Sequence, residues 1–263
     1  MFKINFYILL FLTAFVVLSC EKNEEKKSQV FFSFSQEVNN NPLIFDSIMY
    51  VNAAGNNFMI TEIQYFVSDF TFWKDGKSYP FTSQKFIKYV DTNIPATLNW
   101  DFPEKLPVGS YDSLSFTFGI DSVKNQSNIF ANPPERDMFW PEMMGGGYHY
   151  IKMNGKWIPE GQSQAQAFNL HIGIGQIYAN DSSSTVVKFV QNYFKVVMTK
   201  HFQIFENSNY LAIVMDVNSW FDTPEVYNLD FWGAHIMQNQ NAMHAICLNG
   251  KDAFSLRQFY KDK

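Results

Sequence analysis

The chain has 263 residues, 18% of them aromatic, and a formal net charge of −5 at pH 7. A mildly acidic chain without a basic cluster lacks the electrostatic footprint of a nucleic-acid-binding protein, so we expect no nucleic-acid partner. The 28 phenylalanines supply enough apolar side chain for the core of one large domain.

Residues 1–19 have the pattern of a bacterial lipoprotein signal peptide. Lys3 is followed by an apolar run over residues 6–18, which is short for a helix that spans a bilayer. Residues 17–20, Val-Leu-Ser-Cys, match a lipobox, so we predict that Cys20 is lipidated and anchors the protein to a membrane. A plain signal peptide or an anchor helix is the alternative.

Residues 20–28 comprise the predicted lipidated cysteine and a segment rich in Glu and Lys, which is typical of a solvated tether. The folded domain is then expected over residues 29–263. The expected location is the bacterial outer membrane, with the domain facing the periplasm or the cell surface. Once Cys20 is lipidated, Cys247 is the only thiol, so no intramolecular disulfide can form. We predict that Cys247 is buried and inert within a helix.

Alternating apolar residues predict the strands of this domain. The clearest alternations lie at Val30–Phe34, Leu114–Ile120 and Leu211–Val217. Residues 58–73 are too many for one regular strand, and their change of phase predicts a bulge or break near Ser68-Asp69. Residues 186–198 are apolar on both faces, which predicts one long central strand.

Turn residues separate these runs, and one helix lies near the end of the chain. The predicted turns are Asp75-Gly76, Pro107-Val108-Gly109, Asn154-Gly155 and residues 180–184. Residues 238–248 predict the helix, closed by Asn249-Gly250. Short strands with frequent turns indicate an all-β fold, namely an antiparallel β-sandwich (immunoglobulin-like) with long loops and a short C-terminal helix.

The least ordinary stretch is residues 140–149, Trp-Pro-Glu-Met-Met-Gly-Gly-Gly-Tyr-His. Three consecutive glycines are expected where the chain turns tightly or where another group approaches the backbone closely. Thioether and imidazole donors together suit copper better than magnesium or calcium. We therefore take Met143, Met144 and His149, beside Trp140, as candidate metal-site residues.

A second histidine could complete a ligand pair with His149. His171 alternates with apolar neighbours and is therefore predicted to point away from the apolar face of its strand. Alternation places His149 on the face of Ile151 and Met153, where the alternative is a core histidine bonded to a backbone carbonyl. The alternative for His171 is a surface histidine. Three weaker candidates complete the set: His201, His235 and His244.

These segments resemble the MbnP-like copper-binding family over about residues 28–255. The motifs that carry the resemblance are Gly119-Ile120-Asp121, residues 137–141, residues 147–152 and residues 168–173. The resemblance implies a copper site held by histidines, in which a tryptophan can be oxidised to kynurenine by a di-haem peroxidase-like partner. It also implies that Trp140 is that tryptophan and His149 the histidine that follows it. Glu135 and Arg136 stand upstream of Trp140 in place of histidine.

We therefore expect an envelope lipoprotein that binds copper for acquisition, storage or delivery and is not an enzyme, since no catalytic motif is present. The alternative is a non-catalytic glycan- or protein-binding surface lipoprotein that uses exposed aromatic residues. Its candidate residues are Trp73, Trp100, Trp157, Trp220 and Trp232. Oxygen donors at residues 91–93 and at Asp181-Ser182 leave a calcium site open.

Overall fold

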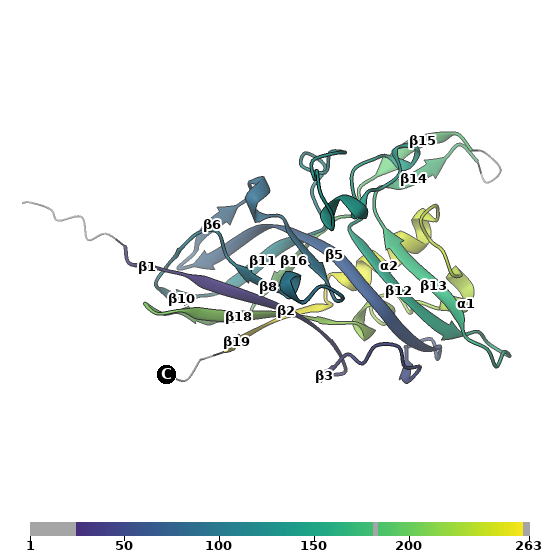
Figure 1. Cartoon of the computed structure of the whole chain (residues 1–263), viewed down its shortest axis with the longest axis horizontal. Helices are drawn as coiled ribbons and strands as arrows, with labels where there is room; N and C mark the ends of the chain where they lie inside the picture. The colour runs from purple at the N-terminus through teal and green to yellow at the C-terminus, as the bar shows by residue number, and fades with distance from the viewer. Residues whose placement is uncertain (1–24, 181–183, 260–263) are drawn as a thin grey trace, which may run out of the picture.

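The computed structural model describes residues 25–180 and 184–259, which form a protein built mainly of β-strands (Figure 1). The predicted signal peptide, Cys20 and Asp181-Ser182 lie outside the described residues. Within the described ranges, no helix has the length and apolar character needed to cross a membrane.

The larger of two main sheets has eight strands, and all of its pairings are antiparallel. Its central path runs β13-β12-β5-β11-β16, and β4, β6 and β7 also pair with the long strand β5. The bounds are β4 (Tyr50–Val51), β5 (Asn57–Lys74), β6 (Lys77–Phe81), β7 (Lys88–Asp91), β11 (Ser113–Phe118), β12 (Ile151–Ile158), β13 (Gln166–Ile172) and β16 (Phe194–Met198).

The second main sheet has five strands in the order β19-β18-β2-β3, with β8 also on β2. Its bounds are β2 (Val30–Val38), β3 (Asn41–Pro42), β8 (Asn99–Asp101), β18 (Asn209–Asp216) and β19 (Phe254–Phe259). The pairing of β18 with β2 is parallel, which departs from the expected antiparallel pattern. Three two-stranded sheets are β1 (Lys27–Ser28) with β9 (Leu106–Pro107), β10 (Gly109–Tyr111) with β17 (Phe202–Ile204), and β14 (Gly175–Tyr178) with β15 (Val186–Val190).

The core lies between the two main sheets and is largely aromatic. The ring centroids of Phe32 on β2 and Phe70 on β5 are 5.7 Å apart, and those of Phe116 on β11 and Phe254 on β19 are 5.3 Å apart. Each such buried side chain contributes about 1.5–3 kcal/mol relative to an exposed one. The predicted all-β sandwich is confirmed.

Helices are few and short. The α-helices are α1 (Leu229–Trp232) and α2 (Gln240–Gly250), and the 3-10 helices are η1 (Gln84–Phe86), η2 (Pro95–Leu98), η3 (Glu135–Met138), η4 (Glu142–Met144) and η5 (Asn218–Phe221). Helix α2 begins two residues later than predicted, because Asn239 Oδ1 caps it by accepting from Ala242 N at 3.0 Å. Cys247 lies buried in α2, and burial raises the pKa of its thiol to about 12, as an inert thiol requires.

Strand β5 confirms the predicted bulge, and the next long strand was predicted wrongly. Asp69 has a φ of 54°, and the register between β5 and β11 shifts beside it. Residues 186–198 are not one central strand, because they divide into β15 and the edge strand β16. The break falls at polar residues with partners elsewhere: Gln191 accepts from Tyr150, and Asn192 donates to the Gly173 carbonyl.

Asn154-Gly155 is not a turn, because both residues lie inside β12. The pairing of β12 with β5 shifts its register there, and a Cβ on Gly155 would stand 2.2 Å from the Met59 carbonyl oxygen. Ordered structure also begins before residue 29: Ser28, in β1, is buried and donates to the Asn207 carbonyl at 2.6 Å. The error at Asn154 matters most, because that side chain contacts the candidate site.

Candidate metal centre

A long loop between β11 and β12 carries the unusual 140–149 stretch. Phe139 and Tyr148 form an isolated β-bridge, and Trp140 N donates to the Gly147 carbonyl at 2.8 Å. The three glycines between them have φ values of 115°, 69° and 78°, in the left-handed region that favours glycine. A Cβ on Gly145 would stand 2.6 Å from Ile174 Cγ2. The predicted tight turn is confirmed, and the group that approaches the backbone belongs to the protein itself.

Trp140 forms a buried wall of the site. Its indole has no exposed surface, and a Cβ on Gly173 would stand 2.5 Å from the ring. The indole Nε1 donates to the Met144 carbonyl at 3.0 Å, which ties the wall to η4. On its other side the indole meets the His149 ring edge-on, with centroids 4.7 Å apart. Trp140 therefore fixes where the His149 ring can lie.

The two predicted histidines come together. The ring centroids of His149 and His171 are 5.3 Å apart, and the ring planes are at 86° to each other. His171 points away from the apolar face of β13, as predicted, since its neighbours Leu170 and Ile172 are buried in the core. His149 is 5% exposed but precedes β12, which begins at Ile151. The alternation that assigned it to the face of Ile151 therefore does not reach it.

Main-chain contacts set the tautomer of His149. Its Nδ1 lies 2.9 Å from the Met138 carbonyl oxygen, and its backbone N–H donates to the same oxygen at 2.7 Å. A carbonyl oxygen only accepts hydrogen bonds, so this network assigns the ring proton to Nδ1. The neutral imidazole then keeps the lone pair of Nε2 for a ligand.

Two side chains set the tautomer of His171. Its Nε2 lies 2.8 Å from Asn154 Oδ1, and Asn154 Nδ2 donates to Glu62 Oε2 at 3.0 Å. The Glu62 carboxylate accepts hydrogen bonds, so it turns the amide nitrogen of Asn154 toward itself and the amide oxygen toward His171. His171 therefore carries its proton on Nε2 and presents the lone pair of Nδ1. Such outer partners orient metal-binding histidines.

Both imidazoles are neutral at pH 7. Burial is the main cause, and it lowers the pKa of His149 to about 3 and that of His171 to about 4. The positive charge of Lys152 lowers both pKa values further. Lys152 stands opposite His171 across the β12–β13 pair, and its ammonium donates to the Asp137 carbonyl at 2.7 Å. Neutral imidazole is the form that binds metal ions.

The separation of the rings suits one shared ion. A metal bound at about 2.0 Å from a ring nitrogen lies about 3.1 Å from the ring centroid, so a tetrahedral angle places two centroids roughly 5 Å apart. The observed 5.3 Å is close to that value. Across the described ranges no cluster of three or more His, Cys, Asp or Glu side chains is suited to a metal. A further ligand would therefore come from outside that set, for example a thioether or water.

A cavity of about 380 Å³ adjoins the pair and supplies further soft donors. Its lining comprises Met144, Asn169, His171, His235, Met237 and Gln238. Of the two candidate methionines, Met144 is 6% exposed and lines this cavity, whereas Met143 is 80% exposed and does not. The structure thus adds His235 and Met237 to the neighbourhood of the site.

Long-range backbone pairing explains why sequence reasoning gave His235 little weight. Asn169 on β13 forms a parallel bridge with His235, and its backbone N–H donates to the Ala234 carbonyl at 2.7 Å. These contacts lay the segment before α2 along β13. No local pattern in the sequence encodes a bridge between residues 66 positions apart.

The other candidates lie elsewhere or have structural roles. His201 and His244 are exposed, and His201 stands 3.7 Å from Asp112. Asp91, in the calcium candidate, already accepts hydrogen bonds from Tyr89, Gln64 and the Asn93 backbone. The tryptophans proposed as a glycan platform are not exposed: two are buried (Trp157 and Trp220) and three half-buried (Trp73, Trp100 and Trp232).

Comparisons with known proteins agree with this architecture. The solved structure of MbnP from Methylosinus trichosporium superposes with a TM-score of 0.52 at 16% sequence identity, covering 89% of this chain and 99% of that chain. At this identity the likeness shows the fold alone. No curated protein sequence matches the chain. The family model described as MbnP matches residues 27–244, which is most of the sequence. The chain therefore belongs to the MbnP family.

Proposed function

We propose that this protein binds copper for acquisition, storage or delivery, without catalysing a reaction. The observation that carries the proposal is the His149–His171 pair, in which only one nitrogen of each neutral ring makes a hydrogen bond to the residues that the structure describes. Membership of the MbnP family supports the choice of metal. The mechanism is coordination by His149 Nε2 and His171 Nδ1.

The surrounding donors favour cuprous copper. Met144 and Met237 line the cavity that His171 borders, and thioethers are soft ligands that select Cu(I). Two neutral imidazoles and a thioether add no negative charge to the site. Because the positive charge of Lys152 lies nearby, a monovalent ion is repelled less there than a divalent one. Trp140 closes one side of the His149 ring and excludes water there.

Three parts of the proposal have their support in sequence motifs: the lipid anchor, the outer-membrane location and the oxidation of a tryptophan. Cys20 is lipidated and anchors the protein to the bacterial outer membrane, facing the periplasm or the cell surface. Trp140 is the residue that a di-haem peroxidase-like partner would oxidise to kynurenine. Intact-mass measurement of protein purified from its native envelope, with peptide mapping, tests both modifications. Unmodified Cys20 and Trp140 would remove these parts and leave the metal proposal standing.

Titration of the purified, untagged protein with Cu(I) under anaerobic conditions tests the metal proposal. One ion per chain is expected, with stoichiometric binding lost in His149→Ala and in His171→Ala. His201→Ala is the matched control, because that histidine is exposed and far from the pair in the sequence. Unchanged binding in both site variants would remove the assignment.

A further inference from the structure

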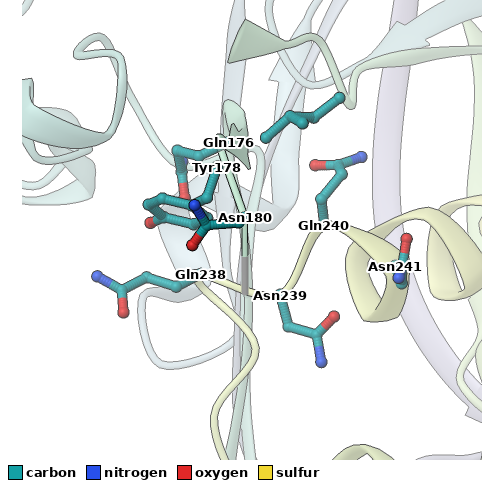
Figure 2. Close-up of a pocket in the computed structure, with 8 residues that line it drawn as sticks. Gln176, Tyr178, Asn180, Gln238, Asn239, Gln240 and Asn241 are labelled. Atoms are coloured by element: carbon teal, nitrogen blue, oxygen red, sulfur yellow. The ribbon is translucent and has the colours of Figure 1, made fainter. Parts of the chain in front are cut away.

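A second, larger cavity lies beside the first and has a different lining. It measures about 640 Å³ and lies between the β14 segment and residues 238–241, where α2 begins. Figure 2 shows Gln176, Tyr178 and Asn180 gathered on one side, with Gln240 and Asn241 on the other. Its volume is within the range of small-molecule sites in proteins.

Carboxamides dominate this cavity. Six of its eight lining residues carry one: Gln176, Asn180, Gln238, Asn239, Gln240 and Asn241. The other two are Tyr178 and Ile177, and none of the eight carries a charge at pH 7. A lining without charge gives no preference to phosphates, carboxylates or metal ions. Each carboxamide offers two N–H donors and an acceptor oxygen, which match the dual character of a hydroxyl group.

Some of these amides are held rigidly by the fold. Gln240 and Asn192 exchange two hydrogen bonds, at 2.9 and 3.1 Å. Asn239 is fixed by its capping bond to Ala242 N. Gln176 is 2% exposed, and its Nε2 donates to the Met144 carbonyl at 2.9 Å, while its Oε1 has no partner among the described residues. A buried amide oxygen without a partner carries a cost in the ligand-free fold.

Other groups in the lining are free to meet a ligand. Within the part of the chain that the structure describes, the side chains of Gln238, Asn241 and Tyr178 make no hydrogen bond to another residue. Gln238 and Asn241 are exposed at the rim. Tyr178 adds an aromatic ring, and such rings pack against the C–H faces of sugars. Rigid amides within and free amides at the rim together form a site for neutral hydroxyl groups.

We propose that this amide-lined cavity binds a neutral saccharide, of one or two sugar units. The site is distinct from the proposed platform of tryptophans and from the metal centre. It makes the protein a binder of uncharged glycan through carboxamides, independently of copper.

NMR titration of the metal-free, ¹⁵N-labelled protein tests the site, because side-chain NH₂ groups of Asn and Gln give their own signals. The probes are glucose, galactose, N-acetylglucosamine and the disaccharide cellobiose, with glucuronate as a charged comparison. At least one neutral sugar is expected to shift the Gln238 and Asn241 NH₂ signals saturably, with a Kd below about 1 mM. Glucuronate should bind no better than glucose.

A double variant, Gln238→Ala with Asn241→Ala, should raise that Kd at least tenfold. Gln84→Ala is the matched control, because it removes a carboxamide that is also exposed, on η1, and should leave the Kd unchanged. Three results would overturn the proposal: no saturable shift with any neutral sugar, binding that survives the double variant, or tighter binding of an uncharged alanine tripeptide amide than of every sugar.

Discussion

The amide cavity and the smaller cavity beside His171 share Gln238 in their linings. The histidine pair and the amide cavity differ, however, in which hydrogen-bonding groups the fold leaves without a partner. At the pair, Met138 and Asn154 take one nitrogen of each ring, so each ring keeps a single lone pair. In the amide cavity, the free side chains keep both donors and acceptors. The two neighbouring sites can therefore prefer different ligands, a soft cation and a hydroxyl-rich molecule.

The largest expected effect is a loss of stability on substitution of Trp140, the buried residue that packs against the His149 ring. Trp140→Ala should lower the free energy of unfolding by about 3–5 kcal/mol, because a fully buried indole is replaced by a cavity. Urea unfolding followed by circular dichroism measures it. Gln238→Ala, at the rim of the amide cavity, should change stability by less than about 0.5 kcal/mol. Equal losses in the two variants would show that the regions do not differ in this way.

The next largest effect is that of acid, which should destabilise the protein through the histidine pair and leave saccharide binding in the amide cavity unchanged. Both folded histidines have pKa values below the ordinary 6.5, about 3 for His149 and about 4 for His171, so the unfolded chain binds more protons below pH 6.5. Stability of the metal-free protein is therefore lost as pH falls from 6.5 toward 4, by up to about 1.4 kcal/mol per pH unit for each ring.

Urea unfolding at several pH values measures this slope. In His149→Gln the slope should be shallower, because the amide does not titrate and can still donate to the Met138 carbonyl. Saccharide binding in the amide cavity should not change between pH 8 and pH 5, since its lining contains no Asp, Glu, His, Lys or Arg side chain. A wild-type slope in His149→Gln would contradict the assignment of the buried neutral ring.

Substitution of Asn154, the hydrogen-bond partner of His171, should have an intermediate effect on metal affinity. Asn154→Ala removes the oxygen that holds the ring proton on Nε2, and loss of such an outer partner costs about 10–100-fold in metal affinity. Cu(I) competition titration measures the change. Asn169→Ala is the control on the neighbouring strand, because Asn169 contacts His235 instead. A larger loss in Asn169→Ala than in Asn154→Ala would contradict the predicted order.

The smallest expected effect is a difference in Cu(I) affinity between variants of the two adjacent methionines. Met144→Leu keeps the buried volume and removes the thioether, so Cu(I) affinity should fall up to about tenfold while stability changes by less than about 1.5 kcal/mol. Met143→Leu should leave the affinity unchanged, since that side chain is exposed and does not line the cavity. The reverse result would move the thioether donor to Met143.

Local patterns predicted many of the strands and the two histidines of the pair, but not every residue around them. Alternation gave β2, β11, β18 and the outward orientation of His171, because strand periodicity is encoded residue by residue. The turn signal failed at Asn154-Gly155, because both residues lie inside β12, opposite a register shift in β5. The Asn154–Glu62 contact and the approach of His235 join segments far apart in the sequence. No period or motif reports such contacts, so the place of these residues near the site became visible only in the fold.

Long-range ¹H–¹⁵N NMR of the histidine rings, before and after addition of Cu(I), tests the central claim most directly. In the metal-free protein, His149 should carry its proton on Nδ1 and His171 on Nε2. One equivalent of Cu(I) should then shift His149 Nε2 and His171 Nδ1 together, while the rings of His201 and His244 stay unchanged. Opposite tautomers in the metal-free protein, or a Cu(I) shift that spares either of the two rings, would contradict the shared site.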